Sequence, residues 1–158
     1  AFSELKTDVE RLSALFYGLN PELDEAFLRG YRFSNKERKA ILERLYLLNL
    51  NEEVTPYLLY KWGIDCLSSV ERLKKVLGRT SALSELDRMW RQLPIRSSQE
   101  LEVRGNDLLS WTGERGGPWV KSLLTTIEEN VVNGNLTNNT EAIRKWVELE
   151  WMKKKNRF

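Results

Sequence analysis

The sequence predicts an all-α fold made of two helical subdomains, with no sizeable sheet. Apolar residues recur at steps of three and four through most of the 158 residues, the spacing that lines one face of a helix. Helix-start signals precede several of these runs, and only the short stretch 101–103 has strand-like spacing. Hydrophobic residues make up 41 % of the chain, with six tryptophans, so we expect a folded core rather than a disordered chain.

The first 93 residues contain the clearest helix signals. Five apolar side chains line one face of a predicted first helix: Leu5, Val9, Leu12, Phe16 and Leu19. Three cap signals begin the next helices: Asn20-Pro21, the capping box of Ser34 and Glu37, and Thr55-Pro56. We expect two further helices over about 65–77 and 81–93.

The stretch Pro94 to Ser98 is the best linker candidate in the chain, so we place a domain boundary there. Residues 1–93 then form a helical body domain, and residues 94–158 form a helical tail domain. In the tail we expect a short helix over 106–112, a break at the glycines that follow, a long helix ended by a left-handed Gly134, and a last helix after Asn139 that buries Ile143, Trp146, Val147 and Trp151.

Composition excludes most catalytic and metal chemistries. The chain has no histidine, which is the commonest general acid–base and metal ligand. It also has no Asp-x-Asp pair for two magnesium ions and no glycine-rich phosphate loop ending in Lys-Ser/Thr. We therefore expect no catalytic residue, metal or cofactor in this chain. An enzyme that uses carboxylates distant in sequence remains an alternative.

The single cysteine and the apolar runs bear on location. Cys66 alone leaves no internal disulfide, which suits a reducing cytoplasm. No apolar run is long enough to cross a bilayer, so we expect a cytoplasmic protein without a membrane partner. Because the chain starts at Ala1 inside a helical pattern, we also expect it to be a fragment of a longer protein.

The segment from Arg115 to Lys121 carries the strongest binding signal. Two glycines allow close approach of the backbone, and Pro118 begins a helix whose first free amides attract phosphate. Arg115 and Lys121 would add positive charge beside them. Trp111 and Trp119 flank the loop, where they would either stack on a base or pack in the core. The alternative is a loop and helix start with no ligand.

Two other groups of basic residues could follow a phosphate backbone, although a solvated helix face is the alternative for each. They are Arg72, Lys75 and Arg79, and Arg29, Arg32, Lys36 and Lys39. The net charge of +2 permits nucleic-acid binding without arguing for it.

Several stretches resemble a known family. In the tail they are Leu93-Pro94-Ile95, Glu100 to Leu109, Gly116 to Lys121, Val131 to Leu136 and Ile143 to Val147. These resemble the C-terminal tail of bacterial class II CCA-adding tRNA nucleotidyltransferases, a family shared with bacterial poly(A) polymerases. Phe27-Leu28-Arg29 and Phe33 to Glu37 are similar to the body domain of the same family.

The resemblance implies a body and a tail that lie along the tRNA acceptor stem and reach its elbow. The family's catalytic head, which holds Mg²⁺ and nucleotide, and its neck, which selects CTP or ATP, have no counterpart in these residues. The expected function is thus to grip tRNA and position its 3′ end for the absent head. The expected partners are tRNA and the head and neck of the parent chain.

Six residues of the loop and helix start are predicted to bind RNA, and two arginines are weaker candidates. Arg115 and Lys121 would contact phosphates, whereas Gly116, Gly117, Trp119 and Val120 would donate amides or shape the loop; the weaker candidates are Arg96 and Arg104. Two alternatives stay open. The chain could be a helical protein-interaction module, or its parent could be a poly(A) polymerase or an enzyme that adds only CC or only A.

Overall fold

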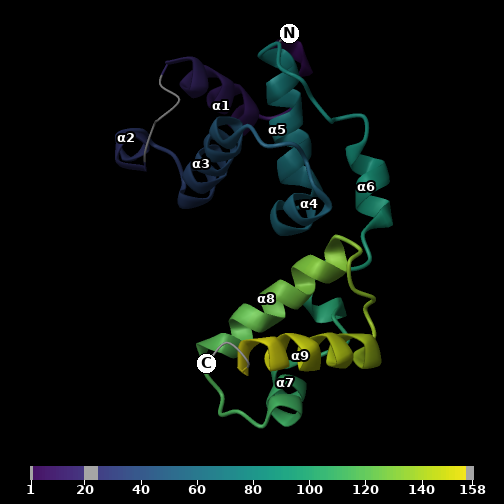
Figure 1. Cartoon of the computed structure of the whole chain (residues 1–158). Helices are drawn as coiled ribbons and strands as arrows, with labels where there is room; N and C mark the ends of the chain where they lie inside the picture. The colour runs from purple at the N-terminus through teal and green to yellow at the C-terminus, as the bar shows by residue number, and fades with distance from the viewer. Residues whose placement is uncertain (1, 20–24, 156–158) are drawn as a thin grey trace. The chain divides into compact units, whose positions relative to one another are not determined.

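A computed structural model describes residues 2–19 and 25–155 of the chain, and all regular elements in these ranges are helical (Figure 1). This confirms the predicted all-α fold. The α-helices are α1 Asp8–Leu19, α2 Glu25–Arg29, α3 Asn35–Leu50, α4 Pro56–Trp62, α5 Ile64–Val76, α6 Leu86–Gln92, α7 Gly105–Thr112, α8 Pro118–Val132 and α9 Thr140–Lys155. Two short 3-10 helices, η1 Phe2–Glu4 and η2 Ser98–Glu100, complete the set. No helix in the described ranges is long and apolar enough to cross a membrane.

The chain divides into two compact units. The first comprises residues 1–54 and 61–90, and the second comprises residues 55–60 and 91–158. The division falls close to the linker expected at 94–98, and it also places the first part of α4 in the second unit. The assignment of 1–93 and 94–158 as separate domains stays a prediction.

In the first unit, α1 packs against α3 and α5, and α2 packs against α3 (Figure 1). Its core contains Phe16, Leu28, Ile41 and Leu45, all of them buried. The predicted inner face of α1 is only partly right, because Leu19 is 70 % exposed whereas Glu10 is 1 % exposed. Glu10 lies inside because Arg72 of α5 pairs with its carboxylate, an interaction that helical periodicity cannot reveal.

Two of the three predicted helix starts are confirmed. The Ser34 amide donates to the Glu37 carboxylate at 2.8 Å, and the Glu37 amide donates to the Ser34 hydroxyl at 3.2 Å, as a capping box requires. The Thr55 hydroxyl accepts the Leu58 amide at 3.1 Å ahead of α4. The third signal, Asn20-Pro21, lies outside the described residues.

The helix expected over 81–93 is shorter than predicted and begins only at Leu86. The buried carboxylate of Glu71 accepts the Ala82 amide at 2.6 Å, and the Ser81 hydroxyl donates to the Glu71 carbonyl at 2.8 Å. These contacts hold residues 81 and 82 outside a helix, so α6 begins only after them.

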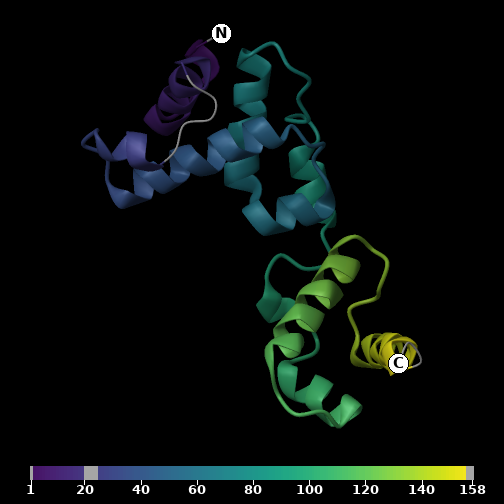
Figure 2. The same ribbon diagram turned by 60° about the vertical axis from the view of Figure 1, so that its left-hand side comes forward.

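In the second unit, α7 packs against both α8 and α9 (Figure 2). Its core is made of apolar residues from all three helices and from the segment before α7: Leu101, Val103, Leu108, Ile127, Val131, Ile143 and Val147. Trp146 is only half-buried, and the side chain of Trp151 lies outside the description. Gly134 has φ of 76° just after α8, as predicted for a left-handed helix end.

The strand-like spacing at 101–103 marks a buried extended segment. The side chain of Asn138 holds this segment in place of a neighbouring strand. It accepts the Glu102 amide at 3.0 Å and donates to the Glu100 carbonyl at 2.9 Å. The side chain of Asn138 thus provides hydrogen-bond partners for one backbone N–H and one backbone carbonyl in the segment just before α7.

Candidate RNA-binding site

The exposed loop 113–117 joins α7 to α8 (Figure 2). Gly113 ends α7 with φ of 69°, and its amide donates to the Leu109 carbonyl at 3.0 Å. Gly117 caps α8, and the Val120 amide donates to the Gly117 carbonyl at 3.1 Å. The loop therefore leads directly into the positive end of a helix of 15 residues.

Two cations flank this helix start. Arg115 and Lys121 are both exposed, and neither forms an ion pair with any acidic residue in the described ranges. Among the described residues of the second unit, the basic side chains that form ion pairs each meet a glutamate of their own helix α9, as Arg144 meets Glu148 at 2.9 Å. Unpaired cations beside helix amides suit a phosphate group.

The indole of Trp119 folds back onto the loop. Its Nε1–H donates to the Arg115 carbonyl at 2.9 Å, and the residue is half-buried. Val120, the next residue, is also half-buried and faces the start of α7. Of the six predicted residues, four are exposed to solvent, namely Arg115, Gly116, Gly117 and Lys121. The other two, Trp119 and Val120, are half-buried.

One residue of this site was missed by the sequence reasoning. A Cβ atom added to Gly105 would lie 3.1 Å from Cγ1 of Val120, so a side chain at this position would require Val120 to shift by a few tenths of an ångström. The signal was a glycine at the first position of a helix, where the backbone does not require one because Gly105 has no positive φ. Gly105 thus helps to place the start of α8.

The two weaker candidates are engaged with the backbone of their own segment. The guanidinium of Arg104 donates to the carbonyls of Leu101, Val103 and Gln99. The guanidinium of Arg96 donates to the Arg91 carbonyl at 3.3 Å. These contacts give both arginines a structural task, and an RNA contact by either stays a prediction.

The basic residues on α5 and just after it, Arg72, Lys75 and Arg79, are engaged by other groups of the protein. Arg72 pairs with Glu10, and Lys75 pairs with Glu4 at 2.9 Å. Arg79 donates to the Leu48 carbonyl at 3.0 Å. Because these partners use the cations for folding, this face fits a structural role better than a phosphate track.

Of the four basic residues on or near α2 and α3, two form ion pairs, as on an ordinary solvated helix face, and two have none in the described part of the chain and could still bind phosphate. Arg29 pairs with Glu25 at 3.1 Å, and Lys39 pairs with Glu43 at 3.8 Å. Arg32 and Lys36 are exposed and have no ion pair within the described residues.

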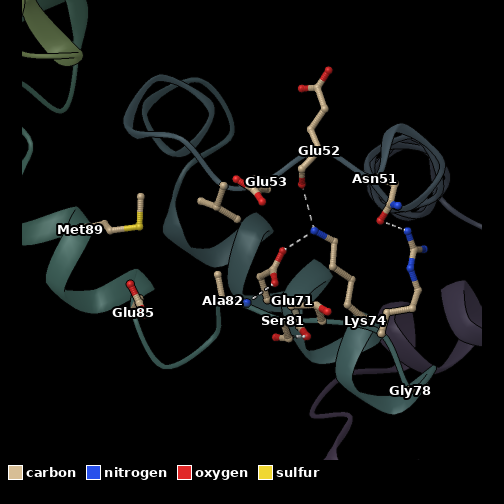
Figure 3. Close-up of a pocket in the computed structure, with 13 residues that line it drawn as sticks. Asn51, Glu52, Glu53, Glu71, Lys74, Gly78, Ser81, Ala82, Glu85 and Met89 are labelled. Carbon is tan, nitrogen blue, oxygen red and sulfur yellow. Dashed lines mark hydrogen bonds and ion pairs between the residues drawn. The ribbon is translucent and has the colours of Figure 1, made fainter.

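The first unit also contains a cavity of about 740 Å³ beside α5 and α6 (Figure 3). At its base the buried Lys74 pairs with Glu71 at 2.7 Å and donates to the Glu52 carbonyl at 3.2 Å. Its charged lining consists of four acidic and two basic residues: Glu52, Glu53, Glu71, Glu85, Lys74 and Arg79. An excess of carboxylates repels phosphate, so the cavity does not suit RNA. No cluster of three or more metal-ligating residues occurs in the part of the chain that the structure describes.

Comparisons with known proteins agree with the resemblance seen in the sequence. Residues 3–147 match the family described as tRNA nucleotidyltransferase domain 2, putative. The CCA-adding enzymes of Bacillus mycoides (strain KBAB4) and Bacillus cereus (strain AH820) are 36 % and 34 % identical to the chain over 152 residues. Each alignment covers 93 % of this chain and 38 % of the relative.

A solved structure has the same fold. The crystal structure of the Bacillus stearothermophilus CCA-adding enzyme in complex with CTP matches with a TM-score of 0.90 and 29 % sequence identity. The match covers 98 % of this chain and 41 % of that chain, so this chain spans less than half the length of these relatives. The chain therefore belongs to the family of the putative tRNA nucleotidyltransferase domain 2, with the all-helical fold of the C-terminal region of CCA-adding enzymes.

Proposed function

We propose that this chain is the tRNA-binding part of a CCA-adding enzyme and acts in the cytoplasm. It grips the acceptor stem and elbow of tRNA, so that the 3′ end reaches a catalytic head outside these residues. That head would use Mg²⁺ with CTP and ATP. The observation that carries the proposal is the exposed loop from Arg115 to Lys121, at a helix start with two unpaired cations, in a chain of this family.

The loop is suited to phosphate and not to reading bases. Backbone amides and long cationic side chains recognise the sugar–phosphate backbone, which is the same in every tRNA. An enzyme that acts on all tRNAs must bind the shared sugar–phosphate backbone and set the distance to the 3′ end, without recognising a base sequence. Holding the elbow at a fixed place converts binding energy into correct placement of the 3′ end.

A titration tests the proposal. The chain is added to full-length tRNA and to an acceptor minihelix without the elbow, at two salt concentrations. We expect tighter binding to the full tRNA and a marked loss of affinity with salt. Replacing both cations, Arg115→Ala with Lys121→Ala, should reduce the slope of log K against log[salt] by about 1.5, roughly 0.7 to 0.9 for each lost phosphate contact.

A matched control separates a specific contact from loss of overall charge. Arg144→Ala with Lys145→Ala removes the same charge from α9, where both cations pair with glutamates of their own helix. This control should leave the slope nearly unchanged. Equal slopes for the two double variants would refute the assignment of the loop as the RNA contact.

A second proposal concerns the apolar surface of the first unit, which favours a protein partner. Phe27 and Tyr31 are 45 % and 47 % exposed, and Leu15 is 50 % exposed. The rings of Phe27 and Tyr31 lie with their centroids 5.4 Å apart, and exposed large apolar neighbours of this kind are typical of a contact surface. We propose the head and neck of the parent chain as that partner. If the folded chain binds neither full-length tRNA nor the minihelix in the titration, a protein-interaction module becomes the better description.

A further inference from the structure

The connection between α8 and α9 (Figure 2) begins with Asn133, the only asparagine of the chain that is followed by glycine. Asn133 is exposed, and its side-chain amide has no hydrogen-bond partner among the described residues. Gly134 has no side chain to shield its backbone nitrogen. These conditions favour attack of that nitrogen on the side-chain carbonyl carbon of Asn133, which is the first step of deamidation.

The chemistry needs water alone. The Gly134 nitrogen forms a bond to Cγ of Asn133, the Cγ–Nδ2 bond breaks, and ammonia leaves with the proton of the Gly134 amide. Water then opens the cyclic imide that results. Cleavage of the nitrogen–Cγ bond gives aspartate at this position. Cleavage of the bond to the backbone carbonyl carbon gives isoaspartate, in which the main chain continues through the former side chain.

The folded chain holds the reacting atoms out of position. The Gly134 N–H donates to the Val131 carbonyl at 3.0 Å, so the nitrogen that must lose its proton is engaged. Asn133 has ψ of 0°, so the Gly134 nitrogen eclipses the backbone nitrogen of Asn133 and lies roughly a third of a turn from Cβ about the Cα–C bond. Ring closure requires this nitrogen and Cβ on the same side. The reaction therefore requires the end of α8 to open.

The same helix end holds the rest of the connection. The Asn130 carbonyl accepts the Asn135 amide at 2.8 Å and the Leu136 amide at 3.2 Å. The connection then reaches Asn138, whose side chain holds the segment before α7. Helix ends open locally at a lower free energy than the whole domain unfolds. Local opening of this turn is thus the cheapest route to the reactive conformation.

We propose that Asn133 is a site of spontaneous deamidation, and that opening of the last turn of α8 sets its rate. The product places a carboxylate at the negative end of this helix. Isoaspartate also lengthens the main chain within the connection that carries Asn138. Both products weaken the second unit, and neither depends on tRNA binding.

The site and its control by the fold are tested in the full 158-residue chain, incubated at neutral pH in water enriched in heavy oxygen, with and without urea. Peptide mass spectrometry detects the new carboxylate by the heavy oxygen that it takes up. In urea we expect product at Asn133 and far less at Asn135, which precedes the branched Leu136. The folded chain should react at least about tenfold more slowly. No product at Asn133 in urea, or equal rates in the two conditions, would overturn the proposal.

Two variants separate local opening from unfolding of the whole chain. Asn138→Ala removes two hydrogen bonds at the far end of the connection, so it should speed deamidation of the folded chain severalfold. Arg72→Met removes an ion pair of the first unit and leaves the connection intact, so it should not change the rate. Equal acceleration by both variants would refute control by the end of α8.

The effect of the product is tested by urea unfolding of two aspartate variants. Asn133→Asp introduces the carboxylate at the negative end of α8, so its unfolding midpoint should fall. Asn139→Asp introduces the same charge at the positive start of α9, where the Asn139 side chain accepts the Ala142 amide at 2.7 Å. Its midpoint should stay unchanged or rise. Equal shifts of the two midpoints would contradict the proposed weakening.

Discussion

The pair of Glu10 and Arg72 gives the sharpest test of how the first unit is held together. The side chain of Glu10 is 1 % exposed and that of Arg72 is 15 % exposed. Arg72 donates from Nε to the carboxylate at 3.1 Å, and the Lys6 amide donates to the other oxygen at 2.6 Å. The substitution Arg72→Met keeps most of the apolar stem but leaves the carboxylate buried without its cation. Breaking a buried pair in this way costs about 3–5 kcal/mol.

The expected loss is measured by urea unfolding at pH 7, followed by circular dichroism at 222 nm. The control is Arg88→Met, because Arg88 and Glu85 form a pair at 3.1 Å with side chains 68 % and 59 % exposed. Such an exposed pair contributes only about 0–1 kcal/mol. The reasoning is refuted if the two variants lose equal free energy of unfolding. Because Arg72 is used for folding, Arg72→Met should also leave the salt dependence of tRNA binding unchanged.

Three further predictions concern titration and backbone conformation. Burial raises the pKa of Glu10, but hydrogen bonds from Arg72 and the Lys6 backbone outweigh burial, so the pKa is lowered from 4.5. The stability that Glu10 contributes should therefore be present above about pH 4.5 and disappear as acid protonates the carboxylate in the folded state. Urea unfolding midpoints between about pH 3 and 6 would measure this loss. Burial, together with the charge and hydrogen bond of Glu128, raises the pKa of Tyr60 from 10.0 to about 12. The absorbance change of Tyr60 at 295 nm should therefore be missing from the tyrosine transition near pH 10. Because Tyr60 does not contribute there, the Tyr60→Phe control should show the same transition near pH 10 as the wild type. Gly134→Ala should cost about 1–2 kcal/mol at φ of 76°, and an unchanged unfolding midpoint would contradict this.

Local signals predicted the helices well where they depend on neighbours in the sequence. The capping box of Ser34 and Glu37 involves residues three apart, and the left-handed Gly134 depends on its own backbone. Both could be recognised from the residue types alone. The start of α6 could not, because Glu71 captures the Ala82 amide from eleven positions away.

The loop of the candidate site could be located from its glycines, proline and flanking cations. The internal geometry of the loop could not be predicted. Gly105 and Gly117 each lie beside a side chain, Val120 and Trp119 respectively, and these approaches are visible only in three dimensions. The burial of Glu10 was missed for the same reason: its partner Arg72 lies 62 residues away, and helical periodicity places charged residues outside by default.

The second unit is built from two stretches of chain, 55–60 and 91–158, with the end of the first unit between them. During synthesis, the segment 55–60 leaves the ribosome well before α8 and α9 exist. Leu59, which is fully buried in the finished fold, therefore has no completed core to enter until the helices of the tail have been made. The second unit thus becomes complete only after its later helices have been made, and a fragment begun at residue 91 would lack a piece of its own core.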